Sequence, residues 1–113
     1  MENIIKKPWG QEEILETNEH YTVKRLTMMD GQQCSKQYHN EKMETIYVVY
    51  GTLSLFLYSG EHLLLEPGNC WTIKPKEIHR MAARNGIVIY LECSTSQLND
   101  VIRIEDDYER DKK

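Results

Sequence analysis

Turn-forming residues recur at short intervals along this chain, which leaves little room for helices. The turn signals are the pairs Asp30 and Gly31, Ser59 and Gly60, Pro75 and Lys76, Asn85 and Gly86, and the triplet Pro67, Gly68 and Asn69. Among them lie segments of four to eight residues that are rich in strand-forming side chains, namely 21–28, 45–50, 52–58, 62–65, 70–73, 78–83, 87–93 and 101–104. This pattern predicts an all-β fold.

No segment carries the apolar stripe of an amphipathic helix. The best helical candidate, residues 11–19, has only Ile14 and Leu15 as apolar side chains. Several short antiparallel strands close most economically as a jelly-roll barrel of two sheets, which shortens the exposed edges and leaves a concave interior. We therefore expect a single domain over residues 1–113, with residues 1–20 packing on the barrel or on a partner chain and residues 105–113 forming a C-terminal tail.

The composition argues against several classes of function. A net charge of -4 and a pI near 5.6 disfavour a nucleic-acid partner, because binding to phosphates needs a basic face. We expect no membrane span and no signal peptide, since the apolar runs are short and interrupted. The cysteines Cys34, Cys70 and Cys93 are far apart and form no Cys-x-x-Cys pair, so we expect a reducing, cytoplasmic location and no disulfide framework.

Residues 37–51 place an amide, an imidazole and a carboxylate just before a strand-like run that ends in glycine. Gln37 and His39 point to the same side of an extended chain, and Glu44 adds an oxygen donor. Divalent transition metals accept this mixture of nitrogen and oxygen ligands. His79, which opens a later strand after a turn with glycine and proline, is the candidate for a further ligand. The chain is therefore expected to hold one metal ion.

These positions resemble the motifs of the cupin superfamily. The first motif has glycine, a His-x-His pair, glutamate and glycine at fixed spacing, and the residues at those positions here are Gly31, Gln37, His39, Glu44 and Gly51. Glutamine thus stands in place of the first histidine. The second motif matches only at its ends, Gly68 and His79. The resemblance implies the cupin double-stranded β-helix, a jelly-roll barrel with the metal in its interior.

Within the cupins, the chain looks most like the mannose-6-phosphate isomerase domain at the C-terminus of bifunctional type II isomerase/guanylyltransferases. The segments that carry this likeness are residues 7–10, 23–26, 37–52 and 100–108. Glutamine at the position of Gln37 is usual in that family. The resemblance implies a homodimer and one divalent metal ion, zinc first and manganese, iron, cobalt or nickel as alternatives. The implied ligands are Gln37, His39, Glu44 and His79. No guanylyl transfer is expected, because the nucleotidyltransferase half is absent.

The implied reaction is the isomerisation of mannose 6-phosphate to fructose 6-phosphate. A divalent cation stabilises the enediolate of such a reaction, and a base must move a proton between neighbouring carbons. Glu44 and Lys42 are the residues expected in catalysis, and Lys42 stands where the family usually has arginine. The base itself is left open between a metal-bound hydroxide and a nearby side chain. For Lys42, a solvated loop lysine is the alternative interpretation.

A phosphosugar also needs cations for its phosphate, and we expect Lys24, Arg103 and Tyr108 to bind the substrate. Lys24 and Arg25 are neighbours in a strand and point to opposite faces, so only one of them can line the barrel. Arg103 and Tyr108 lie in the family-like stretch near the C-terminus. For Arg103, a surface ion pair with Glu105 is the alternative.

The expected partner is therefore a small molecule, either a sugar phosphate or a nucleotide sugar. Other functions remain open beside mannose-6-phosphate isomerisation. One is a cupin ketoisomerase or epimerase that acts on an activated sugar in polysaccharide biosynthesis, which Lys42 in place of arginine favours. Another is a sugar-binding cupin without turnover. A metal-dependent dioxygenase is disfavoured, because no feature of the sequence indicates that chemistry.

Overall fold

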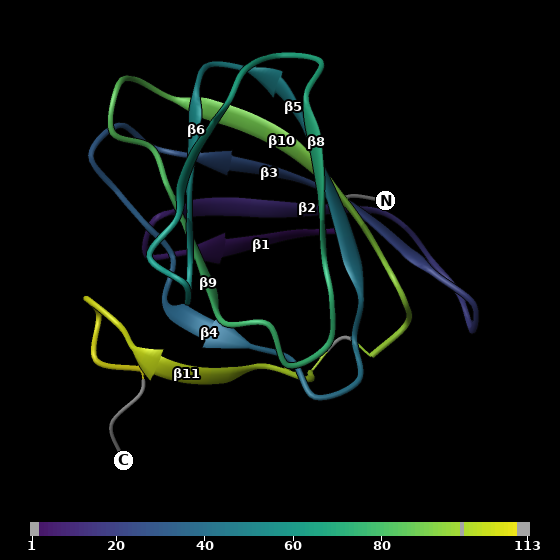
Figure 1. The fold of residues 1–113 in the computed structure, drawn as a ribbon. Helices are drawn as coiled ribbons and strands as arrows, with labels where there is room; N and C mark the ends of the chain where they lie inside the picture. Colours follow the sequence, from purple (N-terminus) through teal and green to yellow (C-terminus); the bar gives the residue numbers. More distant parts are fainter. Residues whose placement is uncertain (1–2, 98, 111–113) are drawn as a thin grey trace.

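A computed structural model describes residues 3–97 and 99–110, and this part of the chain contains β-strands and no helix (Figure 1). The strands are β1 (Ile4–Lys7), β2 (Gly10–Thr17), β3 (Thr22–Met28), β4 (Lys36–Tyr38), β5 (Glu44–Tyr50), β6 (Leu53–Leu57), β7 (His62–Leu65), β8 (Cys70–Ile73), β9 (His79–Ala82), β10 (Val88–Ser94) and β11 (Ile102–Glu105). No helix of the described chain is long and apolar enough to cross a membrane.

The strands form two antiparallel sheets. The six-stranded sheet has the order β1-β2-β3-β10-β5-β8, and the five-stranded sheet has the order β11-β4-β9-β6-β7. Strands β5 and β6 follow one another in the chain but lie in different sheets, and the same holds for β8 and β9, so the chain closes the two sheets into a jelly-roll barrel (Figure 1). The predicted all-β architecture of two sheets is confirmed.

Strands β1, β2 and β4 lie outside the segments that the sequence predicted as strands. Most residues of β2 are polar, because this strand lies close to the edge of the six-stranded sheet and needs few apolar side chains. Residues 4–17 thus form a hairpin that extends the sheet, and Met1 and Glu2 lie outside the described residues. At the other end, turns over residues 106–110 follow β11, and residues 111–113 lie outside the described part.

Alternating side chains of the central strands form one hydrophobic core between the sheets. The buried members are Trp9, Leu26, Met28, Cys34, Ile46, Val48, Leu53, Leu55, Leu65, Ile73, Met81, Ala83, Val88 and Tyr90. Burial of each large aliphatic side chain contributes about 1.5–3 kcal/mol relative to exposure. This cluster is therefore the main force that holds the two sheets together.

The inward-facing positions become charged toward one end of the same strands. Glu92 follows Tyr90 by two residues on β10, Lys24 precedes Leu26 by two residues on β3, and Glu92 and Lys24 are partners in register. Both are buried, as is Glu44 at the start of β5. A buried charge is stable only when it is paired or binds a ligand, so this end of the barrel is where a functional site is expected.

Gly51, between β5 and β6, sits where the chain crosses from one sheet to the other. Its φ angle is +81°, and a Cβ atom there would lie 2.3 Å from the carbonyl oxygen of Ile87. Gly60, between β6 and β7, has a similar φ of +92°, but a Cβ atom there would meet nothing within 4 Å. Of these two glycines, Gly51 alone is required both for its backbone angle and for a close approach of two chain segments.

We predict that Gly51→Ala destabilises the protein by more than Gly60→Ala. The second substitution adds only the left-handed backbone strain of about 1–2 kcal/mol, whereas the first adds a clash with Ile87. The midpoint of urea unfolding measures both, and Gly60→Ala is the matched control. Equal losses would show that the approach of Gly51 to Ile87 contributes nothing to stability.

Candidate metal centre and cavity

Three buried side chains converge at the charged end of the barrel. His39 follows β4, Glu44 opens β5 and His79 opens β9. The Nε2 atoms of His39 and His79 lie 3.3 and 3.4 Å from Oε1 of Glu44, and the two imidazole rings are 5.2 Å apart. Each of the three residues is at most 2% exposed. One ligand atom from each lies within 4.8 Å of the others, which is compact enough to hold a metal ion.

The backbone fixes the orientation of both imidazole rings. Nδ1 of His39 lies 2.5 Å from the carbonyl oxygen of Asp100, and Nδ1 of His79 lies 2.8 Å from that of Glu77. A carbonyl oxygen only accepts hydrogen bonds, so each Nδ1 carries the proton and donates it. In the neutral rings, both Nε2 lone pairs then face Glu44. This second contact through Nδ1 is typical of histidines that bind metals.

The donor atoms fit a divalent cation because they repel one another without it. Two imidazole lone pairs and a carboxylate oxygen meet at one point, and Nε2 of His79 and Oε2 of Glu44 are buried without a hydrogen-bond partner among the described residues. A cation between these atoms would replace the repulsion with attraction. The set of two nitrogens and one oxygen suits zinc, manganese, iron, cobalt or nickel, so it does not identify the metal.

Gln37, the other predicted ligand, lies on β4 directly opposite His79 on β9. Its side chain lines the cavity described below, and its Oε1 atom accepts a hydrogen bond of 2.6 Å from Oγ of Ser35. An amide oxygen has a second lone pair, which this contact leaves available. Gln37 as a metal ligand therefore stays a prediction.

Asp100, in the segment before β11, holds the loop between the candidate metal ligands His39 and Glu44. Its carboxylate accepts hydrogen bonds from the backbone N–H groups of Asn40, Glu41 and Lys42, at 3.0, 2.7 and 3.0 Å. These N–H groups lower the pKa of Asp100. The same residue supplies the carbonyl that orients His39. No pattern in the sequence pointed to this role, because Asp100 is about sixty residues from the loop.

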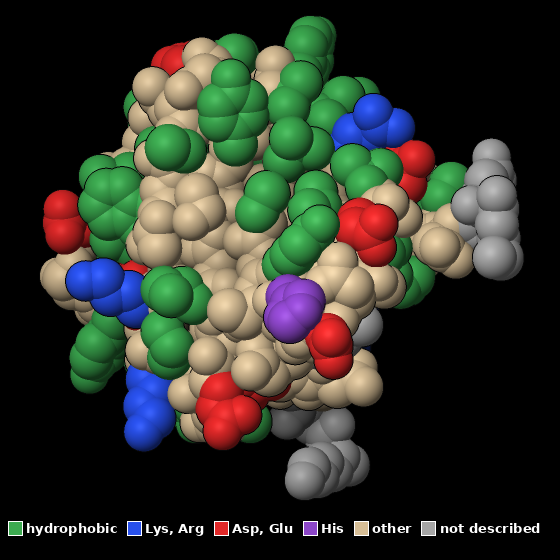
Figure 2. Space-filling view, turned by 90° about the vertical axis from the view of Figure 1, so that its right-hand side faces the viewer, with side chains coloured by type: hydrophobic (Ala, Val, Ile, Leu, Met, Phe, Trp, Pro, Cys, Tyr) green, Lys and Arg blue, Asp and Glu red, His purple; other side chains and the backbone are tan. Residues whose placement is uncertain are grey.

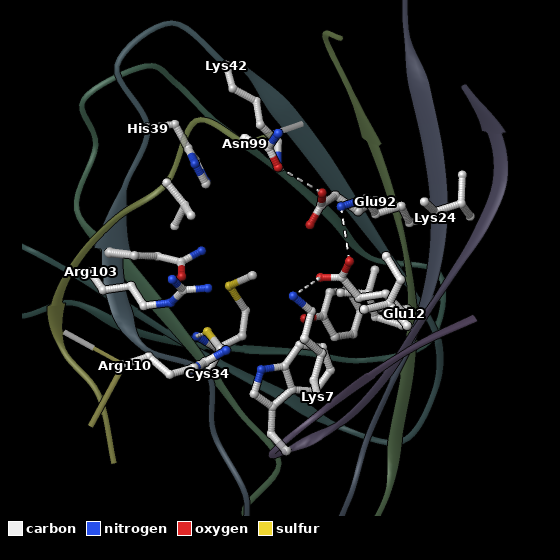
Figure 3. A pocket seen from close by; sticks show the side chains of 18 residues that line it. Lys7, Glu12, Lys24, Cys34, His39, Lys42, Glu92, Asn99, Arg103 and Arg110 are labelled. Carbon is white, nitrogen blue, oxygen red and sulfur yellow. Dashed lines mark hydrogen bonds and ion pairs between the residues drawn. The ribbon is translucent and has the colours of Figure 1, made fainter. Parts of the chain in front are cut away.

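A cavity of about 200 Å³ opens between the sheets beside His39 (Figure 3). Its lining is unusually rich in charge, with the cations Lys7, Lys24, Lys42, Arg103 and Arg110 and the carboxylates Glu12 and Glu92. In Figure 3, Arg103 and Arg110 lie on one side of the cavity, and Glu92 and Glu12 lie on the other. Such a concave, charged space next to a metal centre suits a small polar ligand.

Lys42 is a buried bridge between two carboxylates and not a solvated loop lysine. Its Nζ atom lies 3.5 Å from Oε2 of Glu44 and 3.2 Å from Oε2 of Glu92. Burial alone would lower the pKa of Lys42, but Glu92 and Glu44 outweigh it and raise the pKa above its usual value. Lys42 therefore carries its charge inside the barrel, between the metal centre and the cavity.

Glu92 is a functional candidate that the sequence analysis missed. Burial, and next the negative charge of Glu44, raise its pKa to about 7, and Lys42 opposes that shift. Burial also acts on Glu44, but contacts with His39, His79 and Lys42 overcome it and hold the pKa of Glu44 well below its usual range. The signal available in the sequence was a lone glutamate at an inward position of an apolar strand.

Residues 1–110 match the family described as mannose-6-phosphate isomerase C-terminal. The chain belongs to this family. Mannose-1-phosphate guanylyltransferase ManC of Salmonella typhimurium is 31% identical over 114 residues, which cover 97% of this chain and 24% of that protein. Xanthan biosynthesis protein XanB of Xanthomonas campestris pv. campestris is 33% identical over 113 residues, which cover 94% and 23%. The chain thus spans about a quarter of the length of these relatives.

Solved structures show that this isomerase-family domain has the cupin double-stranded β-helix fold. The capsular polysaccharide assembling protein CapF of Staphylococcus aureus matches with a TM-score of 0.81 at 11% identity, over 93% of this chain and 34% of that one. An RmlC-like cupin of Shewanella frigidimarina matches with a TM-score of 0.76 at 15% identity, over 88% and 87%. The predicted cupin fold is confirmed.

Of the residues that were expected to bind substrate in this cupin domain, Lys24 and Arg103 line the cavity and Tyr108 does not. Arg103, on β11, lines the cavity, and its Nε atom is buried without a hydrogen-bond partner among the described residues. The alternative ion pair of Arg103 with Glu105 is not found among the described residues, and Oε1 of Glu105 lies 3.8 Å from Nζ of Lys36. Lys24 also lines the cavity, but its Nζ atom is 3.1 Å from Oε1 of Glu12.

Tyr108 lies apart from the cavity lining. Its hydroxyl donates a hydrogen bond to Oε1 of Gln32, and its ring packs against the hydrophobic core. Arg110 does line the cavity, but Asp106 holds its guanidinium through contacts of 2.8 and 3.0 Å. Arg103 is thus the cation in this part of the cavity with the most free donors. The substrate-binding roles of Lys24, Arg103 and Tyr108 stay predictions.

We predict that His79→Ala lowers the affinity for a divalent metal by about 100-fold or more while the fold is retained, because one of three converging ligands is lost. The measurement is titration of the metal-free protein with zinc by calorimetry, with the far-ultraviolet circular dichroism spectrum as the check on folding. His62→Ala is the control, since His62 is exposed on β7 and stacks on Phe56. Unchanged zinc affinity in His79→Ala would remove this residue from the site.

Proposed function

We propose that this chain is a metal-dependent sugar-phosphate isomerase that interconverts mannose 6-phosphate and fructose 6-phosphate. The observation that carries the proposal is the buried group of His39, Glu44 and His79 beside a charged cavity, in a chain of this family. A metal ion bound by these residues would act as a Lewis acid on a substrate oxygen. The remaining requirements are a base, a cation near the developing charge and a site for the phosphate.

Glu92 is the side chain best suited to move the proton between C1 and C2. It lines the cavity, whereas Glu44 is turned toward the two histidines. In the forward direction, the Glu92 carboxylate accepts the proton from C2 of the aldose and returns it to C1 of the enediolate. The hydroxyl proton at O2 is lost and one is gained at O1, so the ketose forms without a net change of protons.

Lys42 complements this step as a buried ammonium beside Glu92. Its charge lies where the enediolate oxygens gain negative charge, and burial strengthens that attraction relative to water. The family usually has arginine here, which offers more donors than lysine. The smaller ammonium preserves the charge but not the forked geometry. Lys42 is therefore compatible with isomerisation and is also the residue that sets this chain apart.

Arg103 supports an anionic substrate. Arg103 lines the cavity, and its buried Nε atom has no hydrogen-bond partner among the described residues. Guanidinium groups bind phosphate through paired hydrogen bonds. The size of the cavity favours a monosaccharide phosphate over a nucleotide sugar. At about 200 Å³ it is smaller than the roughly 300–1,000 Å³ typical of sites for drug-sized ligands.

A second candidate function is the isomerisation or epimerisation of an activated sugar in polysaccharide biosynthesis. Lys42 in place of arginine supports it, and one relative is called xanthan biosynthesis protein XanB. Another, from Pseudomonas aeruginosa, is called alginate biosynthesis protein AlgA and is 27% identical over 110 residues. The limited volume of the cavity weighs against this candidate when the activating group is a nucleotide.

The test of the proposed function is the interconversion of mannose 6-phosphate and fructose 6-phosphate by the purified protein. We expect turnover that a chelator abolishes and that zinc, manganese, iron, cobalt or nickel restores to different extents. The metal content is measured in the same samples. Absence of turnover in fully metal-loaded protein would contradict the proposal and move the assignment to another sugar or to binding alone.

Glu92→Gln tests the role of the base. We expect kcat to fall by about 100-fold or more, with little change in metal content, because only the proton-accepting group is lost. Glu12→Gln is the control, since Glu12 is a carboxylate of the same cavity that is paired with Lys24 and Lys7. An equal loss of kcat in both variants would mean that negative charge in the cavity, and not proton transfer by Glu92, is what matters.

A further inference from the structure

Tyr90 is a buried polar residue that the proposed reaction does not use. It lies on β10 two residues before Glu92, so both side chains face the interior of the barrel. Its side chain is 0% exposed and lines the cavity. Its hydroxyl has no hydrogen-bond partner among the described residues. Burial raises the pKa of Tyr90 well above its usual value, so the group is a neutral phenol that can both donate and accept.

The strand neighbours of Tyr90 offer its hydroxyl no hydrogen-bond partner. Its neighbours in register, Leu26 on β3 and Val48 on β5, are buried and apolar. A buried hydroxyl without a partner costs about 1–3 kcal/mol, and phenylalanine would fill the same space without that cost. The hydroxyl is not needed for packing in the core, so its partner is expected in the cavity that Tyr90 lines.

Tyr90 and Arg103 line the cavity from opposite sheets, and each carries a buried polar atom without a hydrogen-bond partner among the described residues. The hydroxyl belongs to the six-stranded sheet, and the Nε atom belongs to β11 of the five-stranded sheet. Two such unpartnered groups on facing walls match a ligand with different chemistry at its two ends. The Arg103 side suits an anion, whereas the Tyr90 side suits a sugar hydroxyl that exchanges hydrogen bonds with the phenol.

We propose that Tyr90 forms a sugar-hydroxyl subsite that selects the polyol part of a phosphorylated sugar. This proposal rests on the proposed function for the identity of the ligand. Tyr90 binds and orients the sugar, and it takes no part in proton transfer. A site that hydrogen-bonds a substrate hydroxyl discriminates strongly against ligands without it, because its own polar group is then left unpaired.

Tyr90→Phe separates this role from a structural one. In the metal-loaded protein without ligand, we expect a melting temperature equal to or higher than that of the parent. Stabilisation by mannose 6-phosphate should shrink, and the KM for mannose 6-phosphate should rise about 10-fold, with a smaller change in kcat. Stabilisation by inorganic phosphate should not change. Arg103→Gln is the matched variant and should lose the response to inorganic phosphate.

A marked fall in the melting temperature of unliganded Tyr90→Phe, with unchanged response to mannose 6-phosphate, would overturn the proposal. An unchanged KM with normal turnover would overturn the subsite and leave the isomerase function intact. Absence of turnover in the parent, with stabilisation by mannose 6-phosphate that Tyr90→Phe weakens, would keep the subsite and reject the isomerase. The two proposals therefore fail in different ways.

The outer face of the six-stranded sheet has few charges over three of its strands. The outward side chains of β5, β8 and β10 are uncharged, although 28% of the residues in the chain are charged. They are Thr45, Tyr47, Val49, Cys70, Thr72, Ile89, Leu91 and Cys93. Figure 2, turned to the side from which β5 and β8 are seen, shows hydrophobic side chains between charged groups. An antiparallel sheet that faces water normally carries polar residues there.

Discussion

Burial of the Glu44 carboxylate is the constraint on which the rest of the site depends. A carboxylate removed from water is unstable unless cations or hydrogen-bond donors surround it. Glu44 therefore requires the ammonium of Lys42 on one side and, on the other, a cation shared with the imidazoles of His39 and His79. Because Lys42 carries a full charge, it in turn draws Glu92 toward it. One buried charge thus organises the metal ligands and the candidate base into a single cluster.

This cluster lies where the apolar part of the barrel interior meets the charged part. Along β3 and β10, the inward side chains change from the apolar Met28 and Val88 to the charged Lys24 and Glu92 within one strand. The apolar end supplies the packing energy, and the charged end borders the cavity. Stability and ligand binding therefore share the same strands but use different residues. This division lets the cavity retain unpaired polar groups that a uniform core would not tolerate.

The spacing of the motif predicted the site residues that lie close together in the sequence or at the start of a predicted strand. His39 and Glu44 lie at the two ends of one loop, and His79 is the first residue of a strand that follows a predicted turn. The motif therefore predicted that these three side chains converge. Strand β2 was not predicted because most of its side chains are polar, and β1 and β4 were not predicted because they are only four and three residues long. The roles of Glu92 and Asp100 were not predicted. They depend on strand register and on contacts between distant segments, which one sequence does not reveal.

The contact between Asp100 and the loop of His39 also bears on the order of folding. The backbone of this loop donates its hydrogen bonds to a residue 58 to 60 positions later in the chain. Contacts of such long range form late, because a large loop must close before they contribute. The candidate metal site is therefore expected to be complete only after the C-terminal segment has docked. A metal ion would then stabilise the finished barrel and would not serve as a nucleus for its early assembly.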